Sequence, residues 1–345
     1  HPTLGGLLIN RGITDFEKSR AFFRPSLEML HDPFLMKDLD LAVNRLSDAL
    51  ARNEHILIYG DYDVDGTTSV ALMYSFLKNH TENIRFYIPD RYTEGYGISE
   101  KGIEYAASID CQLIIALDCG IRALNMADLS KKKGIDLIIC DHHIPGSILP
   151  KAYAVLDPKR KDCRYPFKEL SGCGVGFKLL QGFCLQHTLD LGSLFNYLDL
   201  VAVSIASDIV PMVGENRILA YFGMQKINSQ PLKSLQALID IAGIKAPISI
   251  SDVVFYIGPR INAAGRLRHA HESVDLLISE DPVQLKDFAQ RLNEVNKKRQ
   301  NIDQTVTEEA LRTIHEELPV TAKSTVLFNP KWHKGIVGIV ASRCI

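Results

Sequence analysis

The stretch HILIYGDYDVDGTTSVALMYSFLK (55–78) contains a strand pattern, an acidic turn and a helix pattern in direct succession. Its first six residues form an apolar run with the length of a strand that is buried on both faces. Three aspartates, Asp61, Asp63 and Asp65, follow at alternate positions and precede a glycine. The Thr-Thr-Ser cluster at 67–69 is typical of a helix N-terminus. The stretch therefore predicts a strand–turn–helix unit with carboxylates at the turn.

The same alternation of short apolar runs and helical patterns continues to about residue 160. This order predicts βαβ units, in which the strands are parallel and helices cover both faces of the sheet. We therefore expect an α/β fold with a doubly wound, mostly parallel sheet. Its strands are expected at 55–60, 84–88, 113–117, 136–140 and 154–156.

The pattern becomes helical from about residue 171, and its longest helical stretch (281–317) contains neither glycine nor internal proline. A long helix of this polarity is typical of a connection between two domains. Residues 324–330 then have the pattern of a strand, and 332–343 that of a turn entering a helix. We expect a helical N-terminal segment (1–52), a main α/β domain with a helical C-terminal part (53–280), a long connecting helix (281–317) and the start of a second α/β domain (318–345).

Composition places the chain among ordinary globular proteins, with 46% hydrophobic and 23% charged residues among 345. No run of about 18 apolar residues is present, which argues against a membrane span. The seven cysteines form no C-x-x-C pair and are expected to be reduced thiols of a cytosolic protein. A net charge of −2 argues weakly against a broad basic surface for nucleic acids, because a local basic track is compatible with a neutral total.

Acidic groups follow three of the expected strands. These groups are Asp61 with Asp63, then Asp118, and then Asp141 with His142 and His143. Ligands of an open parallel sheet bind at the carboxyl ends of its strands, so we expect these side chains to meet at one edge. A single such aspartate is more often a cap or a turn residue, but capping explains three strand ends poorly. Oxygen ligands with some imidazole suit Mn²⁺ or Mg²⁺ better than Zn²⁺, and two such ions support phosphoryl displacement.

The spacing D-x-D-x-D-G also begins the calcium-binding loop of an EF-hand. An EF-hand requires a glutamate at the twelfth loop position and a helix on each side. The twelfth position counted from Asp61 is Leu72, and the segment before Asp61 has a strand pattern. The calcium interpretation therefore fails on both counts.

The segments DYDVDG, LDCG, DHH and SDIVPM resemble the four motifs of the DHH phosphoesterase superfamily. HPTLGGLLINRGI, IPDRYTEGYG, GPRINAAGR and WHKGIVGIVASR further resemble the RecJ family of single-stranded-DNA exonucleases, and these segments extend over nearly the whole chain. The resemblance implies that 53–280 is a DHH catalytic domain and that a DHHA1-type domain, incomplete here, begins at 318. It also implies 5′-to-3′ hydrolysis of single-stranded DNA to mononucleotides, in DNA repair and recombination, with a two-ion site for Mn²⁺ or Mg²⁺.

The resemblance further implies a set of catalytic residues. The metal ligands would be Asp61, Asp63, Asp118, His142 and Asp208. Asp141 and His143 would orient these ligands or assist the leaving group. Asp65 would contact a water near the ions or cap the following helix. Other branches of the superfamily have a histidine where this chain has Leu57, so the site would contain one imidazole fewer.

Basic and aromatic residues near these motifs are expected to bind DNA. Phosphate or DNA contacts are expected from Arg91, Tyr96, Arg260, Asn262, Arg266, His333, Ser342 and Arg343. The resemblance supports this role for Arg260, Asn262 and Arg266, and Arg91 with Tyr96 would pair a cation with a ring that stacks on bases. The stretch GPRINAAGRLRHAHES, which also carries Arg268, is expected to be a glycine-rich basic loop whose guanidinium groups match phosphate oxygens. Tyr96 would stack on a base without sequence preference, the alternative being ordinary packing. His333, Ser342 and Arg343 would form a phosphate pocket that faces the metals.

The resemblance also implies a cytoplasmic monomer that has no membrane contact and works with a single-strand-binding protein and a RecQ-type helicase. Two alternatives remain open. A related DHH phosphodiesterase would act on short oligonucleotides or cyclic dinucleotides. A non-catalytic single-strand-binding scaffold is the second alternative, but it predicts a broken acid set, whereas all four motifs are intact here.

Overall fold

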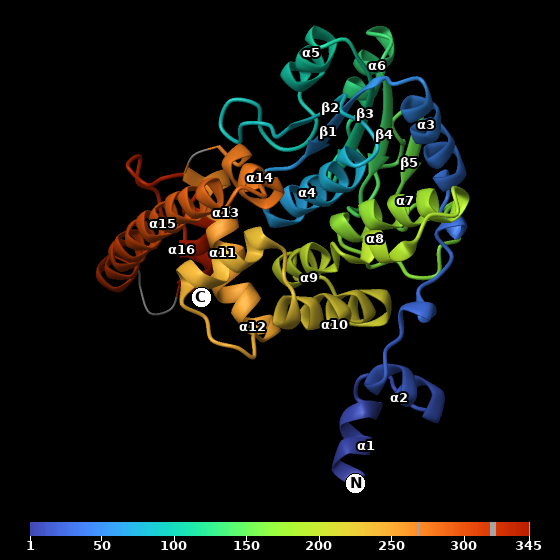
Figure 1. Ribbon diagram of the computed structural model, residues 1–345. Coiled ribbons are helices and arrows are strands. Elements are labelled where there is room, and N and C mark those ends of the chain that lie inside the picture. Colours follow the sequence, from blue (N-terminus) through green and yellow to red (C-terminus); the bar gives the residue numbers. More distant parts are fainter. Residues whose placement is uncertain (268, 318–321, 345) are drawn as a thin grey trace.

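Figure 1 shows the computed structural model of the chain, which describes residues 1–267, 269–317 and 322–344. Its sheet has five parallel strands in the order β2-β1-β3-β4-β5. The strands are β1 (His55–Gly60), β2 (Ile84–Tyr87), β3 (Cys111–Leu117), β4 (Asp136–Cys140) and β5 (Ala154–Leu156). The chain winds outward in both directions from β1 and β3, as in doubly wound folds. The structure thus confirms the predicted fold class.

Helices cover both faces of this sheet. Ile56 and Ile58 of β1 face one core, while Leu57 and Tyr59 face the other, because successive strand side chains point to opposite sides. The helices on the first face are α3 (Leu39–Ala51), α4 (Val64–Lys78) and α7 (Gly172–Gln186), and those on the second are α5 (Glu100–Ser108) and α6 (Leu124–Lys132). The strands are therefore buried on both sides, and polar groups gather where they end.

The helix after the acidic turn begins one turn earlier than predicted. Asp63 is the N-cap of α4, and its Oδ1 accepts a hydrogen bond from the Gly66 amide at 3.0 Å. Thr67, Thr68 and Ser69 lie inside the helix, where their hydroxyl groups donate to carbonyl oxygens one turn before. These bonds satisfy the hydroxyl groups without a capping role. The acidic turn itself therefore starts the helix.

The chain is helical after β5. Besides α7, this part contains α8 (Leu191–Phe195), α9 (Leu198–Ser207), α10 (Gly214–Ser229), α11 (Lys233–Ala242), α12 (Ile250–Asp252), the π-helical segment η3 (Val253–Ile257), α13 (Gly258–Leu267) and α14 (His271–Ile278). Most of the segment expected to be a basic loop (258–273) thus lies in helices, with 258–267 in α13 and 271–273 at the start of α14. A Cβ added at Gly258 would lie 2.7 Å from Ser207 Oγ, and one at Gly265 would clash with the Tyr62 carbonyl oxygen. Glycine serves here in close helix packing rather than in a loop.

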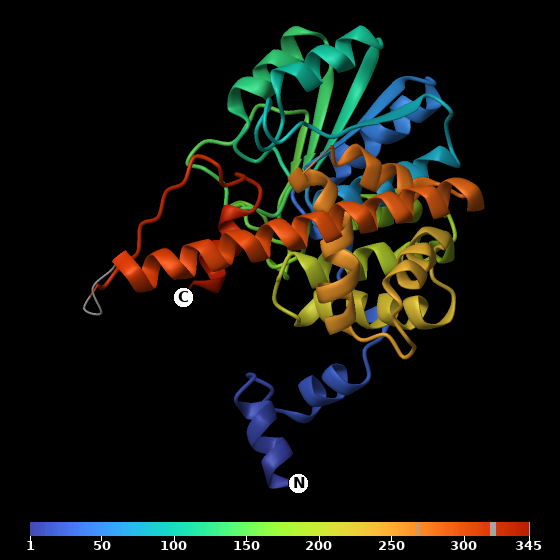
Figure 2. The same ribbon diagram turned by 90° about the vertical axis from the view of Figure 1, so that its left-hand side faces the viewer.

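The predicted long helix is α15 (Pro282–Glu317), which crosses the molecule and extends beyond the sheet (Figure 2). Its far part packs on α16 (Val337–Arg343) through a small apolar cluster that includes Ala310 and Val340. The strand expected at 324–330 is irregular instead, and Val326 and Phe328 are exposed. No strand among the described residues lies beside this segment to pair with it. The proposed domain boundaries stay a prediction.

The N-terminal helices α1 (Pro2–Ile9) and α2 (Phe16–Phe23) project from the rest of the molecule (Figures 1 and 2). Helix α2 contacts α10, where Arg217 donates to the Phe22 carbonyl oxygen at 3.0 Å. Two short turns, η1 (Leu27–Met29) and η2 (Pro33–Leu35), lead into α3. No helix among the described residues has the length and apolar character that a membrane crossing requires.

A buried ion pair ties this N-terminal segment to the helical part. Lys178 of α7 and Glu215 of α10 are 2.7 Å apart, and their side chains are at most 1% exposed. The Lys178 ammonium group also donates to the His31 carbonyl oxygen, and Glu215 accepts from the His31 amide and from the Tyr165 hydroxyl group. Each charge is thus paired and hydrogen-bonded, as burial requires.

Candidate metal centre

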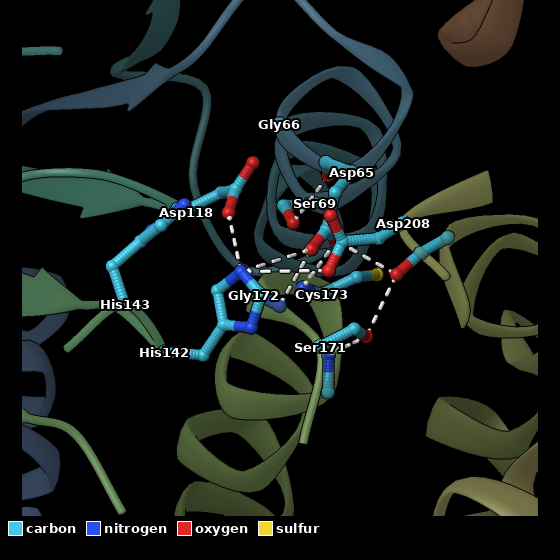
Figure 3. A network of polar contacts seen from close by, with 12 residues as sticks. Asp65, Gly66, Ser69, Asp118, His142, His143, Ser171, Gly172, Cys173 and Asp208 are labelled. Carbon is cyan, nitrogen blue, oxygen red and sulfur yellow. Dashed lines mark hydrogen bonds and ion pairs between the residues drawn. The ribbon is translucent and has the colours of Figure 1, made fainter. Parts of the chain in front are cut away.

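The imidazole ring of His142 lies among carboxylates at the carboxyl edge of the sheet (Figure 3). Its Nε2 is 3.1 Å from Oδ1 of Asp118, 3.6 Å from Oδ2 of Asp208 and 3.7 Å from Oδ2 of Asp65. His142 follows β4, Asp118 follows β3, Asp208 follows α9, and Asp65 lies in the first turn of α4. Four separate elements therefore bring ligand-type atoms to one point.

The backbone at Asp118 is unusual. Its φ of 60° lies in the left-handed region, which an L-residue other than glycine adopts infrequently and which Asp tolerates better than most. The first residue of α7 lies directly against it, because a Cβ added at Gly172 would be 2.6 Å from the Asp118 Cβ. The position of this carboxylate therefore depends on a glycine in a distant segment.

Asp65 caps a helix other than the one that we expected. Its carboxylate accepts hydrogen bonds from the amides of Gly172 and Cys173 at 2.7 and 2.8 Å, and from Ser204 Oγ at 2.7 Å. A carboxylate at the N-terminus of α7 is favoured by the helix dipole. Asp65 thus joins α4 to α7 and α9 while its Oδ2 still faces His142.

Asp61 and Asp63 lie in the acidic turn between β1 and α4, but they do not belong to the two clusters of ligand atoms that include His142. The groups whose ligand atoms lie within 4.8 Å of one another are Asp118 with His142 and His143, and Asp65 with His142 and Asp208. Within the described part of the chain, neither carboxylate oxygen of Asp61 has a hydrogen-bond partner, although both are buried. Burial, followed by the neighbouring Asp63 carboxylate, raises the pKa of Asp61 to about 8.

Electrostatics favour a cation at this centre. Burial, with the Asp65 carboxylate as the next cause, raises the pKa values of Asp118 and Asp208. Burial also lowers the pKa of His142, which favours the neutral imidazole that binds metals. A buried carboxylate without a partner is costly unless it is neutralised or binds a metal ion. These oxygen donors with one neutral imidazole therefore fit Mn²⁺ or Mg²⁺.

His143 lies beside this group, with a ring nitrogen within 4.8 Å of ligand atoms of Asp118 and His142, and is fixed by Asp141. Its Nδ1 lies 2.7 Å from Asp141 Oδ1, and Asp141 Oδ2 accepts from the Ile121 amide at 2.8 Å. Burial would raise the pKa of Asp141, but the contacts with His143 and backbone amides outweigh it and lower that pKa. The bond to Asp141 raises the pKa of His143 in turn. The pair is therefore held in a charged state.

Arg91 and Tyr96 have different partners rather than each other. The Arg91 guanidinium group lies 5.0 Å from the centre of the Tyr62 ring. The Tyr96 hydroxyl group donates to the Asp118 carbonyl oxygen at 3.2 Å and lies at the same distance from His143 Nε2. Tyr96 is 55% exposed, so its ring remains accessible next to the acidic centre.

The basic residues of α13 contact the C-terminal segments. Arg260 donates to Asn293 Oδ1 of α15, and Arg266 donates to the Gly335 carbonyl oxygen at 2.9 Å. Asn262 is half-buried on the same helix, and Arg268 lies outside the described residues. A Cβ added at Gly335 would clash with the Arg266 carbonyl oxygen, so these two backbones touch.

The C-terminal candidates lie around α16. The His333 ring contacts the Tyr92 ring edge to face, with the ring centres 5.7 Å apart. Ser342 donates to the Gly338 carbonyl oxygen within α16, and Arg343 pairs with Asp303 of α15 at 3.0 Å. Their expected common phosphate pocket stays a prediction.

Asp157 is a buried acid that our sequence analysis missed. It directly follows β5, so the pattern AVLD (154–157) is the same strand-end signal that identified Asp118. Its Oδ1 accepts from the Lys159 amide, while Oδ2 is buried without a partner among the described residues. Burial raises its pKa to about 7. A fourth strand end therefore adds a carboxyl group to this edge.

Comparisons with known proteins agree with this geometry. Residues 55–205 match the model of the DHH family, N-terminal domain. The single-stranded-DNA-specific exonuclease RecJ of Bacillus subtilis (strain 168) is 38% identical over 346 residues, which cover 100% of this chain and 43% of that protein. A crystal structure of exonuclease RecJ bound to manganese is 31% identical, has a TM-score of 0.83 and matches 92% of this chain and 79% of its own. The chain belongs to the RecJ family.

RecJ from Thermus thermophilus in complex with Mn²⁺ is similar as well, with a TM-score of 0.84 and 28% identity over 98% of this chain and 47% of that one. Another structure of RecJ from this organism contains Mg²⁺. The chain spans between 43% and 61% of the length of the curated RecJ proteins. RecJ structures thus contain both ions that suit the donor set described above.

Proposed function

We propose that this chain is the catalytic part of a metal-dependent exonuclease that hydrolyses single-stranded DNA from the 5′ end to mononucleotides. The observation that carries the proposal is the meeting of Asp65, Asp118 and Asp208 around His142, beside the unpartnered carboxylate of Asp61. The names of the RecJ relatives support the substrate class.

Two Mn²⁺ or Mg²⁺ ions would be held by the predicted ligands. These are Asp61, Asp63, Asp118, His142 and Asp208, with Asp65 close enough to take part. When bound, such ions provide a nucleophilic water and neutralise charge on the phosphoryl oxygens. Around them, Asp65 and Gly172 keep the carboxylates in place through α7.

His143 is the residue best placed to supply a proton to the leaving oxygen. Asp141 engages its Nδ1 and favours the protonated ring. The other ring nitrogen, Nε2, lies 3.2 Å from the hydroxyl oxygen of the exposed Tyr96. Arg260 and Arg266 of α13 would compensate the phosphate charge.

The cellular setting that we propose is DNA repair and recombination in the cytoplasm. The protein would act as a monomer, on strands that a RecQ-type helicase exposes and a single-strand-binding protein covers. A pull-down of this chain with each partner, with and without single-stranded DNA, tests this part of the proposal.

The decisive experiment uses the same single strand labelled at either end, with Mn²⁺ present. A 5′ label should appear at once in mononucleotide, whereas a 3′ label should remain on progressively shorter strands. Asp118→Asn should reduce turnover by about 100-fold or more. Asp128→Asn, at an exposed position of α6, is the matched control and should behave as wild type. Wild-type turnover in Asp118→Asn would refute the metal assignment.

A series of substrate lengths tests the remaining alternatives. An enzyme of the RecJ type should degrade long single strands, whereas a phosphodiesterase for short oligonucleotides should fail on them. Binding without any metal-dependent turnover would favour the scaffold.

A further inference from the structure

One face of α15 is polar and nevertheless buried. Asn293, Asn296 and Asp303 are 5%, 2% and 1% exposed. The side chain of Arg299, between them, is 12% exposed. Spacings of three, three and four residues place all four on one side of the helix. Because buried polar groups are costly unless they are bonded, the partners of this face indicate its role.

Asp303 joins two arginines. Its Oδ2 lies 3.0 Å from Nη2 of Arg343 on α16 and 3.7 Å from Nη1 of Arg299. Asn296 Oδ1 accepts a further hydrogen bond from Arg299 Nη2 at 3.1 Å. One carboxylate thus serves two guanidinium groups, so these three groups together carry a net positive charge. The side chain of Arg343 is 51% exposed, so part of its fork of donors faces solvent.

Asn293 holds a third arginine, from another segment. Its Oδ1 accepts from Nε of Arg260 at 3.1 Å, while Arg260 Nη1 donates to the Tyr256 carbonyl oxygen at 2.7 Å. Asn293 and Asp303 are ten residues apart, which corresponds to about 15 Å along the helix. Arg260 and Arg343 come from α13 and α16, and α15 contacts both of these helices.

We propose that this polar face of α15 positions Arg260 and Arg343 for successive phosphates of the single strand, with Arg299 as a third cation between them. This inference rests on the proposed function, because it assumes a single-stranded DNA substrate. Asp303 and Asn293 are then positioning residues, which act through the arginines that they hold. The orientation of each guanidinium group is fixed before the strand arrives, so less side-chain freedom is lost on binding.

Asp303→Asn distinguishes a positioning role of Asp303 from a purely electrostatic effect of its negative charge, because the two change DNA affinity in opposite directions. Removal of a negative charge from a surface that binds DNA should strengthen binding. Loss of a positioning residue should weaken it, because Arg343 is then no longer held. The two explanations predict opposite changes in affinity.

The test measures binding of a 3′-labelled single strand by fluorescence anisotropy, without divalent metal, at a series of salt concentrations. We expect Asp303→Asn to weaken binding by roughly fivefold to tenfold. The slope of log K against log salt should fall by about 0.7 for each phosphate that the variant no longer binds. Glu294→Gln removes an exposed acid from the same helix and is the matched control, which should bind as wild type.

A double-mutant cycle provides the structural control. Asp303→Asn should have little further effect in an Arg343→Gln background if Asp303 acts through Arg343, whereas an independent structural effect would add fully. The cycle of Asn293→Ala with Arg260→Gln repeats the test if Asp303→Asn does not fold. Unchanged or tighter binding in Asp303→Asn, or additive effects in these cycles, would overturn the inference. A wild-type protein that does not bind single-stranded DNA would instead refute the proposed function.

Discussion

The carboxylates of the acidic centre differ in whether protein groups donate hydrogen bonds to them. Asp65 and Asp141 each accept several hydrogen bonds, so their charge is stabilised by the fold itself. Asp61 has no such partner among the described residues, and its pKa is raised to about 8. The first two carboxylates therefore maintain the geometry, and the third requires a proton or a cation.

This difference predicts how the stability of the metal-free protein depends on pH. A carboxyl group whose pKa is raised on folding stabilises the fold at low pH, and this stabilisation is lost as pH rises through the folded pKa. The usual pKa of Asp61 is 3.8 and the raised one is about 8. We expect the metal-free unfolding temperature to fall between about pH 4 and about pH 8.

The stabilisation that Mn²⁺ provides should increase with pH, because the ion competes with protons for the same carboxylate oxygens. The increase in unfolding temperature on adding Mn²⁺ should therefore grow with pH, and calorimetry with and without the ion measures it. Asp61→Asn should make both the metal-free unfolding temperature and the increase caused by Mn²⁺ less dependent on pH. A stabilisation by Mn²⁺ that is equal at all pH values would contradict this assignment.

At the scale of elements, the N-terminus of α7 determines where Asp118 lies. Gly172→Ala would place a Cβ 2.6 Å from the Asp118 Cβ, so we expect a large loss of activity together with weaker Mn²⁺ binding. Gly174→Ala is the matched control on the same helix, because its nearest neighbour would be 3.4 Å away. This control should retain activity and gain up to about 1 kcal/mol from helix propensity.

Turnover assays and metal titration of both variants measure these effects. If Gly172→Ala retained wild-type activity, the carboxylate would not depend on this contact.

The strands and the strand-end acids could be predicted because both signals are local. An apolar run followed by an acid identifies β3 with Asp118 and β4 with Asp141. Non-local contacts could not be predicted in this way. The glycines of α13 resemble those of a loop in sequence, but they allow the helix to touch Tyr62 and Ser207, residues from distant segments. Likewise, the partners of Asp65 are more than 100 residues away, so its capping of α7 leaves no mark in the local pattern.

At the scale of the whole molecule, the buried pair of Lys178 and Glu215 links the N-terminal segment to the helical core. Lys178→Met would leave the Glu215 carboxylate buried without its cation, and we expect a loss of about 3–5 kcal/mol in unfolding free energy. Urea denaturation measures this loss. Lys245→Met, at an exposed position, is the control and should change stability by less than about 0.5 kcal/mol. Equal stabilities of the two variants would show that the pair is not needed for the fold.

The close contacts of Gly265 in α13 and of Gly335 in the turn before α16 limit which substitutions these two positions can accept. Gly265 touches the carbonyl oxygen of Tyr62 in the acidic turn, and Gly335 touches that of Arg266. Close main-chain contacts at these two glycines thus help to set the separation between the acidic turn, α13 and the segment before α16. Substitutions in the surrounding apolar core can change its volume without altering this separation, whereas one methyl group at either glycine increases it. Saturation mutagenesis should therefore recover only glycine at both positions among active variants.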